Sequence, residues 1–242
     1  MSSKKEEKQE KKQEKKYYLF KMNLKILNIL SIVLLIVMMG IGYLFYHDIF
    51  KDIMDSEFNV GFFLLFFALY TIFHEILHSI AYVINGAKFK RITYGIYLEK
   101  SILCCLCKQN ITKKNILISL MYPLFFIGIV TFIIGAIFKL PILYVLSIVN
   151  ISGCIGDIIM FNFIVRLDKN IKFSEFDDPT AFAIYSDKNL SRMKPFGLDF
   201  IGSETKLKQD DLKKVRMSKE SVFFLIILVL MSFFMLIPNF VK

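Results

Sequence analysis

Five long apolar stretches constrain the fold of this 242-residue chain more than any other feature of its sequence. They are Ile26–Tyr46, Val60–Ile84, Ile116–Phe138, Pro141–Val165 and Ser221–Phe240. Each holds about 20 residues, the length that an α-helix needs to cross a bilayer. Inside lipid every backbone N–H and C=O must be paired within the protein, which favours helices. We therefore predict an all-α polytopic membrane protein with about five transmembrane helices.

Lysine and arginine are distributed unevenly between the segments that connect these stretches. The N-terminal segment holds 9 of them, the loop 85–115 holds 7 and the loop 166–220 holds 12. The loop 47–59, the turn at Lys139 and the C-terminal end hold 1 each. Because Lys and Arg accumulate in cytoplasmic loops, this alternation predicts a cytoplasmic N-terminus. The net charge of +10 would then attract anionic lipid headgroups, and it requires no nucleic acid.

The same features divide the chain into consecutive segments. We expect a disordered basic cytoplasmic tail at 1–25, a transmembrane anchor helix at 26–46 and a membrane-embedded core at 60–185. A cytoplasmic loop at 186–220 and a C-terminal transmembrane helix at 221–242 follow. The tail is rich in Lys, Glu and Gln and begins without apolar periodicity, a composition that is typical of disorder.

Two connecting loops carry signals of local structure. In the loop 85–115, residues 91–98 alternate between apolar and more polar side chains, and the short apolar stretch Ser101–Leu106 follows. A period of two is typical of strands, so we expect an interfacial β-hairpin, with an irregular connector as the alternative. In the loop 166–220, Asp178-Pro179 predicts the start of a short helix over Thr180–Tyr185. Lys194-Pro195-Phe196-Gly197 predicts a turn.

A cluster of polar residues, His74-Glu75-Ile76-Leu77-His78, lies near the predicted cytoplasmic end of the second stretch. Positions i and i+4 share one helix face, so both imidazoles can bind one metal ion. Glu75 between them can act as general base toward a water at that metal. A carboxylate in hydrocarbon is costly unless it is paired or faces a wet cavity. The motif therefore predicts a membrane-embedded hydrolase that uses Zn²⁺.

A catalytic zinc ion needs a third protein ligand and one open position. Among the 21 Asp and Glu residues, Glu75 and Asp157 are the two that lie within the apolar stretches. Glu75 is the 16th residue of its stretch and Asp157 the 17th of its own, so both lie at a similar depth. We predict Asp157 as the third ligand beside His74 and His78. The alternative is Glu99, which follows His78 by 21 residues.

Asn150 precedes Asp157 on the fourth stretch and would share its helix face. We predict that Asn150 binds the substrate backbone, with a hydrogen bond to a neighbouring helix as the alternative. Gly153 and Gly156 flank this face, and small residues there allow another helix to approach closely.

Together these residues resemble the bacterial membrane family of putative zincin peptidases, a distant relation of the site-2 proteases. The similarity covers roughly residues 60–185. It rests on the motif His74–His78, the cysteine-containing loop that leads to Pro123, the run Asn150…Gly156-Asp157, and Asp178-Pro179-Thr180. The resemblance implies a metallopeptidase of the bacterial plasma membrane.

We therefore predict a zinc metallopeptidase that cuts membrane or membrane-adjacent substrates near the cytoplasmic face. The strand 91–98 would pair with the extended substrate by edge addition. Two other classes of function stay open. A zinc protein that binds or chaperones partners without cutting them would not need the acid Glu75. A small transporter would be expected to contain an inverted repeat, and we find none in the sequence.

Overall fold

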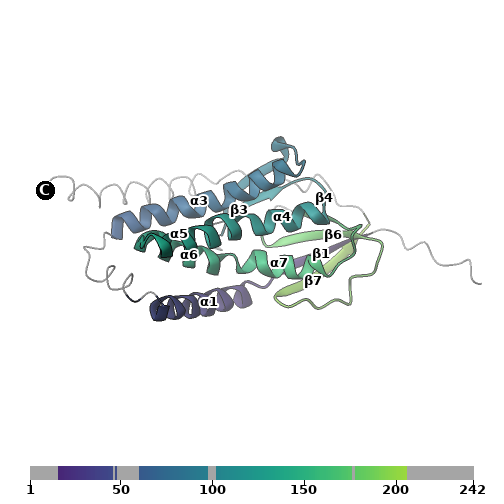
Figure 1. Ribbon diagram of the computed structural model, residues 1–242. Coiled ribbons are helices and arrows are strands. Elements are labelled where there is room, and N and C mark those ends of the chain that lie inside the picture. The colour runs from purple at the N-terminus through teal and green to yellow at the C-terminus, as the bar shows by residue number, and fades with distance from the viewer. Residues whose placement is uncertain (1–15, 46, 48–59, 98–101, 176–177, 206–242) are drawn as a thin grey trace, which may run out of the picture.

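The structure, a computed structural model, describes residues 16–45, 47, 60–97, 102–175 and 178–205. Its helices run side by side, and most of the strands gather at one end of them (Figure 1). The helices are α1 (Leu24–Phe45), α3 (Val60–Ile84), the short 3₁₀ helix η1 (Phe89–Arg91), α4 (Lys113–Pro123), the π-helix η3 (Leu124–Val130), α5 (Thr131–Ile137), α6 (Pro141–Gly153) and α7 (Ile155–Val165).

Three helical segments are long and apolar enough to cross a membrane, namely Leu24–Leu44, Phe63–Ile84 and Lys113–Ile137. Helices α6 and α7 form a fourth candidate if the pair, which bends by 44°, is one span. These segments correspond to the first four predicted stretches. The fifth, Ser221–Phe240, lies outside the described residues.

The prediction of an all-α protein was wrong. Among the described residues, seven strands form two antiparallel sheets, so the fold mixes α and β structure. The strands are β1 (Lys16–Met22), β2 (Ile92–Tyr97), β3 (Ile102–Cys107), β4 (Ile111–Thr112), β5 (Lys172–Glu175), β6 (Ala181–Ser186) and β7 (Leu198–Glu204). One sheet has the order β4-β5-β6-β1-β7, and the other pairs β2 with β3.

The larger sheet is built from segments that we predicted to be a disordered tail and charged loops. Strand β1, inside the predicted tail 1–25, lies between β6 and β7. Its Phe20 is fully buried, pairs in register with Phe182, and packs against Phe163 of α7 at a ring distance of 4.8 Å. The three segments rich in Lys and Arg therefore all supply strands to one sheet at one end of the helices. This aromatic core stabilises strands that isolated loops could not form.

The predicted short helix over Thr180–Tyr185 is a strand instead. Asp178 does not cap a helix, because its Oδ1 accepts hydrogen bonds from the N–H and the hydroxyl of Thr180, at 2.9 and 2.6 Å. Such a turn within the loop competes with helix initiation. The following segment then pairs with β1 on one side and β5 on the other. The predicted turn at Lys194–Gly197 is confirmed, since the Leu198 N–H donates to the Pro195 carbonyl.

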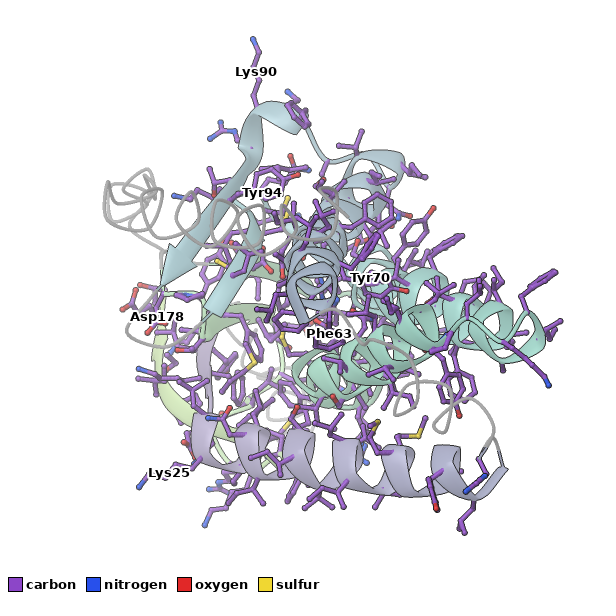
Figure 2. The ribbon with its side chains drawn as sticks, turned by 90° about the vertical axis from the view of Figure 1, so that its left-hand side faces the viewer. Lys25, Phe63, Tyr70, Lys90, Tyr94 and Asp178 are labelled. Atoms are coloured by element: carbon purple, nitrogen blue, oxygen red, sulfur yellow. The ribbon has the colours of Figure 1, made fainter. Side chains whose placement is uncertain are left out.

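The predicted β-hairpin is confirmed. Strands β2 and β3 pair antiparallel, with Tyr94 opposite Cys105. The hairpin lies against helix α3, because the Tyr94 hydroxyl donates to Ser79 Oγ at 2.6 Å. Figure 2 shows Lys90, in η1 just before β2, at the outer end of this region and Tyr94 nearer to the helices. The hairpin is therefore docked on the helix that carries the histidine motif.

The fourth predicted stretch is broken at Cys154 into α6 and α7. Small residues, Ser152, Gly153 and Gly156, surround the break, and such residues are common at kinks. Only one of the two glycines meets another helix: a Cβ at Gly156 would lie 3.5 Å from Leu27 of α1, whereas none of the described atoms lies within 4 Å of a Cβ at Gly153. The break places Asp157 in the first turn of α7, where a carboxylate is favoured by the helix dipole.

Candidate metal centre and active site

Three side-chain atoms that can bind a metal ion lie close together, and they come from two helices. His74 and His78, one turn apart on α3, bring their Nε2 atoms within 3.1 Å of each other. From α7, Asp157 Oδ2 lies 3.4 Å from His74 Nε2 and 3.5 Å from His78 Nε2. The structure thus brings together the three residues predicted as metal ligands. Glu99, the alternative ligand, lies outside the described residues.

The separations of these three atoms fit a tetrahedral zinc site. Zinc binds imidazole nitrogen and carboxylate oxygen at about 2.0–2.1 Å, so two ligands of a tetrahedron lie about 3.3 Å apart. The observed separations are 3.1, 3.4 and 3.5 Å. Two imidazoles and one carboxylate also supply three protein ligands and leave a fourth position open, as in catalytic zinc sites.

The outer ring nitrogen of each histidine is held by a hydrogen-bond acceptor. His78 Nδ1 lies 2.9 Å from the Ser119 carbonyl, which can only accept, so Nδ1 carries the proton and Nε2 of the neutral ring offers a lone pair. The same carbonyl would receive the N–H of residue 123 in a regular helix, but Pro123 has none. Pro123 therefore leaves the Ser119 carbonyl available to orient His78.

His74 is oriented by Asn150. Asn150 Oδ1 lies 2.9 Å from His74 Nδ1, and the amide nitrogen of the same side chain donates to Cys154 Sγ at 3.7 Å. The structure thus shows the alternative that we gave for Asn150, a hydrogen bond to a neighbouring helix. Its predicted role in substrate binding stays a prediction. Partners of this kind fix the tautomer and orientation of a metal-binding histidine.

Replacing Asn150 with alanine tests which role dominates. If Asn150 acts by orienting His74, metal affinity should fall about 10- to 100-fold, the usual effect of removing an outer partner. Asn150→Asp, which keeps an acceptor for Nδ1, should retain most of the affinity. Zinc titration of the purified variants measures both values. Unchanged zinc affinity with a raised KM would instead indicate contact with substrate.

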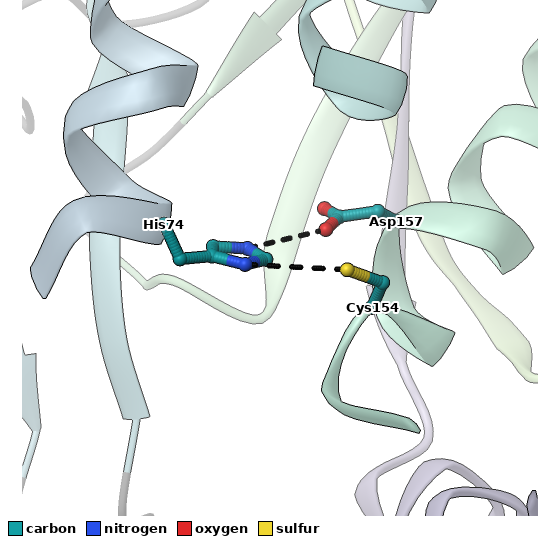
Figure 3. A group of neighbouring side chains, drawn as sticks. All are labelled: His74, Cys154 and Asp157. Carbon is teal, nitrogen blue, oxygen red and sulfur yellow. Dashed lines mark hydrogen bonds and ion pairs between the residues drawn. The ribbon is translucent and has the colours of Figure 1, made fainter. Parts of the chain in front are cut away.

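Cys154 lies beside the site, but its sulfur faces Nδ1 of His74 rather than Nε2. Its Sγ is 4.0 Å from His74 Nδ1, whereas Asp157 approaches Nε2 (Figure 3). One ligand atom each from His74, Cys154 and Asp157 lies within 4.8 Å of the others. His78 Nε2, however, lies on the Nε2 side of His74. The possible metal ligands lie closest together around Nε2 of His74, and Cys154 is therefore not one of the three closest ligand atoms.

Glu75 is buried next to the three donor atoms, with 9% of its surface exposed. The backbone N–H of Cys105 on β3 interacts with its carboxylate. His74, Glu75 and Gly153 line two cavities at once. One cavity, of about 170 Å³, extends toward β3 and the larger sheet. The other, of about 400 Å³, extends between α1, α3 and α6. Glu75 is therefore reached both from the strands and from between the helices.

The segment that carries these residues is similar to a known protein family. The model of a family described as "Putative zincin peptidase" matches residues 66–172. This match covers 107 of the 242 residues, and it shows that the segment is similar to the zincin peptidase family. The matched segment contains the histidine motif, Asn150 and Asp157, so the predicted resemblance to putative zincin peptidases is confirmed. The distant relation to site-2 proteases stays a prediction. No curated protein and no solved structure matches the chain.

Glu175 of β5 is a further acid in the cavity on the strand side, and it lies beyond the segment matched by the zincin peptidase family. Sequence analysis missed it, because it stands in a loop that holds many charged residues. It is buried, with 8% of its surface exposed. Burial raises the pKa of Glu175 from 4.5 to about 7, despite the hydrogen bonds that it accepts from the Cys107 amide and Tyr82. The apolar residues Ile171 and Phe173, shortly before Glu175, were a sequence signal that this loop is partly buried.

The raised pKa of Glu175 predicts a pH-dependent stability. Because the folded-state value exceeds the ordinary one, the contribution of this group is present below about pH 4.5 and is lost as pH rises through about 7. Relative to Glu175→Gln, the wild type should lose roughly 3 kcal/mol of unfolding free energy over this range. Thermal unfolding of the two metal-free proteins in detergent at several pH values measures the difference. Parallel pH profiles would contradict the prediction.

Proposed function

We propose that this protein is a membrane-embedded zinc metallopeptidase that cuts membrane or membrane-adjacent substrates near the cytoplasmic face. The observation that carries the proposal is the convergence of His74, His78 and Asp157 on one point, with separations that suit zinc. The similarity of residues 66–172 to a family described as putative zincin peptidases supports the reaction class. Helices long and apolar enough to cross a bilayer support the location.

The chemistry of each side chain indicates its role in peptide hydrolysis. Zinc, when bound by His74, His78 and Asp157, would supply a Lewis acid that lowers the pKa of water and polarises a carbonyl. Glu75 would take the proton from the attacking water and then deliver it to the leaving nitrogen as the peptide bond breaks. The amide of Cys105 would keep the Glu75 carboxylate oriented during both transfers.

The substrate is expected to lie along β3. We predicted edge addition on the strand 91–98, which is β2, but the strand that borders the cavity is β3: Leu103, Cys104, Cys105 and Leu106 line it. An extended peptide could add to the edge of β3 that no described strand pairs with. The cavity between α1, α3 and α6 would receive the adjoining apolar part of a membrane substrate.

The test uses purified full-length protein in lipid vesicles that also contain synthetic single-span peptides with varied cytoplasmic flanks. New peptide termini detected by mass spectrometry in the presence of zinc, and absent after treatment with a zinc chelator, would support the proposal. A chain that binds zinc but generates no new termini from any peptide would favour the alternative, a zinc protein that binds partners without cutting them.

A further inference from the structure

Glu175 connects the helix that carries the zinc-binding motif to the strand that borders the site. Its Oε1 accepts a hydrogen bond from the Tyr82 hydroxyl of α3 at 3.1 Å. Its Oε2 accepts a hydrogen bond from the backbone N–H of Cys107 on β3. Tyr82 follows His78 by one helical turn on the same face. One carboxylate of β5 thus contacts both α3 and β3.

Two of the three carboxylates that line the cavity on the strand side, those of Glu75 and Glu175, meet alternate amides of β3. The Cys105 amide interacts with Glu75, and the Cys107 amide, two residues later, donates to Glu175. Residues i and i+2 of a strand direct their backbone groups to the same edge. No described strand pairs with this edge, since β2 pairs with the opposite one. Glu175 and Glu75 therefore fix the register of this edge of β3 relative to α3. A peptide added here would pair with the carbonyls of this edge rather than with these two amides.

A buried acid in this position is costly to the fold. Tyr82 is 2% exposed and Glu175 is 8% exposed, and no ion pair among the described residues includes Glu175. A buried carboxylate without a cation is normally disfavoured, and such groups concentrate at functional sites. Its cost is offset here by two hydrogen bonds, both of which lead to elements of the active site.

We propose that Glu175 is a positioning residue that holds β3 in the register at which this edge aligns a peptide substrate with Glu75. This inference rests on the proposed peptidase function. A shift of β3 by one residue would turn the Cys105 amide away from Glu75 and would turn the opposite edge of the strand toward the peptide. Glu175 would therefore act on substrate binding through β3, without touching the reacting atoms.

The native cysteines of β3 report on its anchoring independently of peptide cleavage. Cys107 is fully buried and Cys105 is 6% exposed. Burial raises the pKa of the Cys107 thiol to about 12 and also raises that of Cys105, so both thiols should react slowly in the folded protein. Cys154, fully buried at the break between α6 and α7, serves as an internal control for general loosening.

The experiment compares four full-length, zinc-loaded proteins: the wild type, Glu175→Ala, Glu175→Gln and the exposed-acid control Glu204→Ala. Alkylation by N-ethylmaleimide is followed at each cysteine by mass spectrometry. Glu175→Ala should raise labelling of Cys105 and Cys107 at least about 10-fold through local opening, with Cys154 unchanged. Glu175→Gln, which still offers an acceptor to the Cys107 amide and a donor to Tyr82, should behave like the wild type.

Peptide cleavage provides the second measurement. Glu175→Ala should lower kcat/KM about 10-fold, mainly by raising KM, with zinc content unchanged and with rescue by Glu175→Gln. Wild-type thiol protection or wild-type KM in Glu175→Ala, or an equal rise in Cys154 labelling, would overturn the proposal. A wild type that cuts no peptide would refute the peptidase function by itself, and the thiol measurement would still decide whether Glu175 anchors β3.

Discussion

Replacing Glu75 with glutamine should lower peptide cleavage by about 10²- to 10⁴-fold, the range that a general base contributes. Glutamine has nearly the same shape and can still accept from the Cys105 amide, so the fold and the zinc content should stay those of the wild type. Cleavage of vesicle-embedded peptides and metal analysis of the same sample measure the two effects together.

The control for this variant is an acid outside the site. Asp168 forms an exposed ion pair with Lys188 at 3.0 Å, and Asp168→Asn should therefore leave cleavage unchanged. If zinc-loaded Glu75→Gln cuts as fast as the wild type, Glu75 is not the general base. Loss of zinc together with activity would show that Glu75 contributes to the metal site itself.

Asp157→Asn should have the second large effect, on zinc affinity. The amide carries no charge and is a poor zinc ligand, and removing a direct ligand should cost more than the 10- to 100-fold of an outer partner, hence more than about 100-fold. Cleavage should fall with the loss of zinc. Competition of the purified protein with a fluorescent zinc chelator measures the affinity, and Glu99→Gln provides the matched comparison.

The variants of Asp157 and Glu99 distinguish the two candidates for the third zinc ligand. If Asp157 is the third ligand, Asp157→Asn loses zinc and Glu99→Gln keeps it. The reverse pattern would move the ligand to Glu99 and would leave the carboxylate of Asp157, 3.4 Å from His74, as an ion-pair partner only.

The close approach of His74, His78 and Asp157 could be predicted because charged groups are costly within long apolar stretches. An Asp or Glu in an apolar stretch must find a partner, so Glu75 and Asp157 pointed to a common site at one depth. The break at Cys154 did not disturb this, since Asp157 follows it by less than one turn. The hydrogen-bond partners of the histidines could not be predicted from the sequence. The role of Pro123 in freeing the Ser119 carbonyl is evident only from the structure, in which α4 lies beside α3.

The larger sheet could not be predicted because its strands are short and come from distant, highly charged segments. Lys172–Glu175 contains one apolar residue, and Lys16–Met22, although five of its seven residues are apolar, directly follows a charged tail. The strand character of both depends on pairing and on the shared aromatic core around Phe20. Strand propensity depends strongly on such context. Glu175 was missed for the same reason, because only the sheet buries it beside the site.

Zinc K-edge X-ray absorption of the purified full-length protein tests the central claim most directly. The account predicts one zinc per chain, with nitrogen and oxygen ligands at about 2.0–2.1 Å, imidazole scattering from two histidines, and loss of this signal in His74→Ala. A zinc-free protein, or sulfur ligands at about 2.3 Å that indicate binding by cysteine, would contradict it.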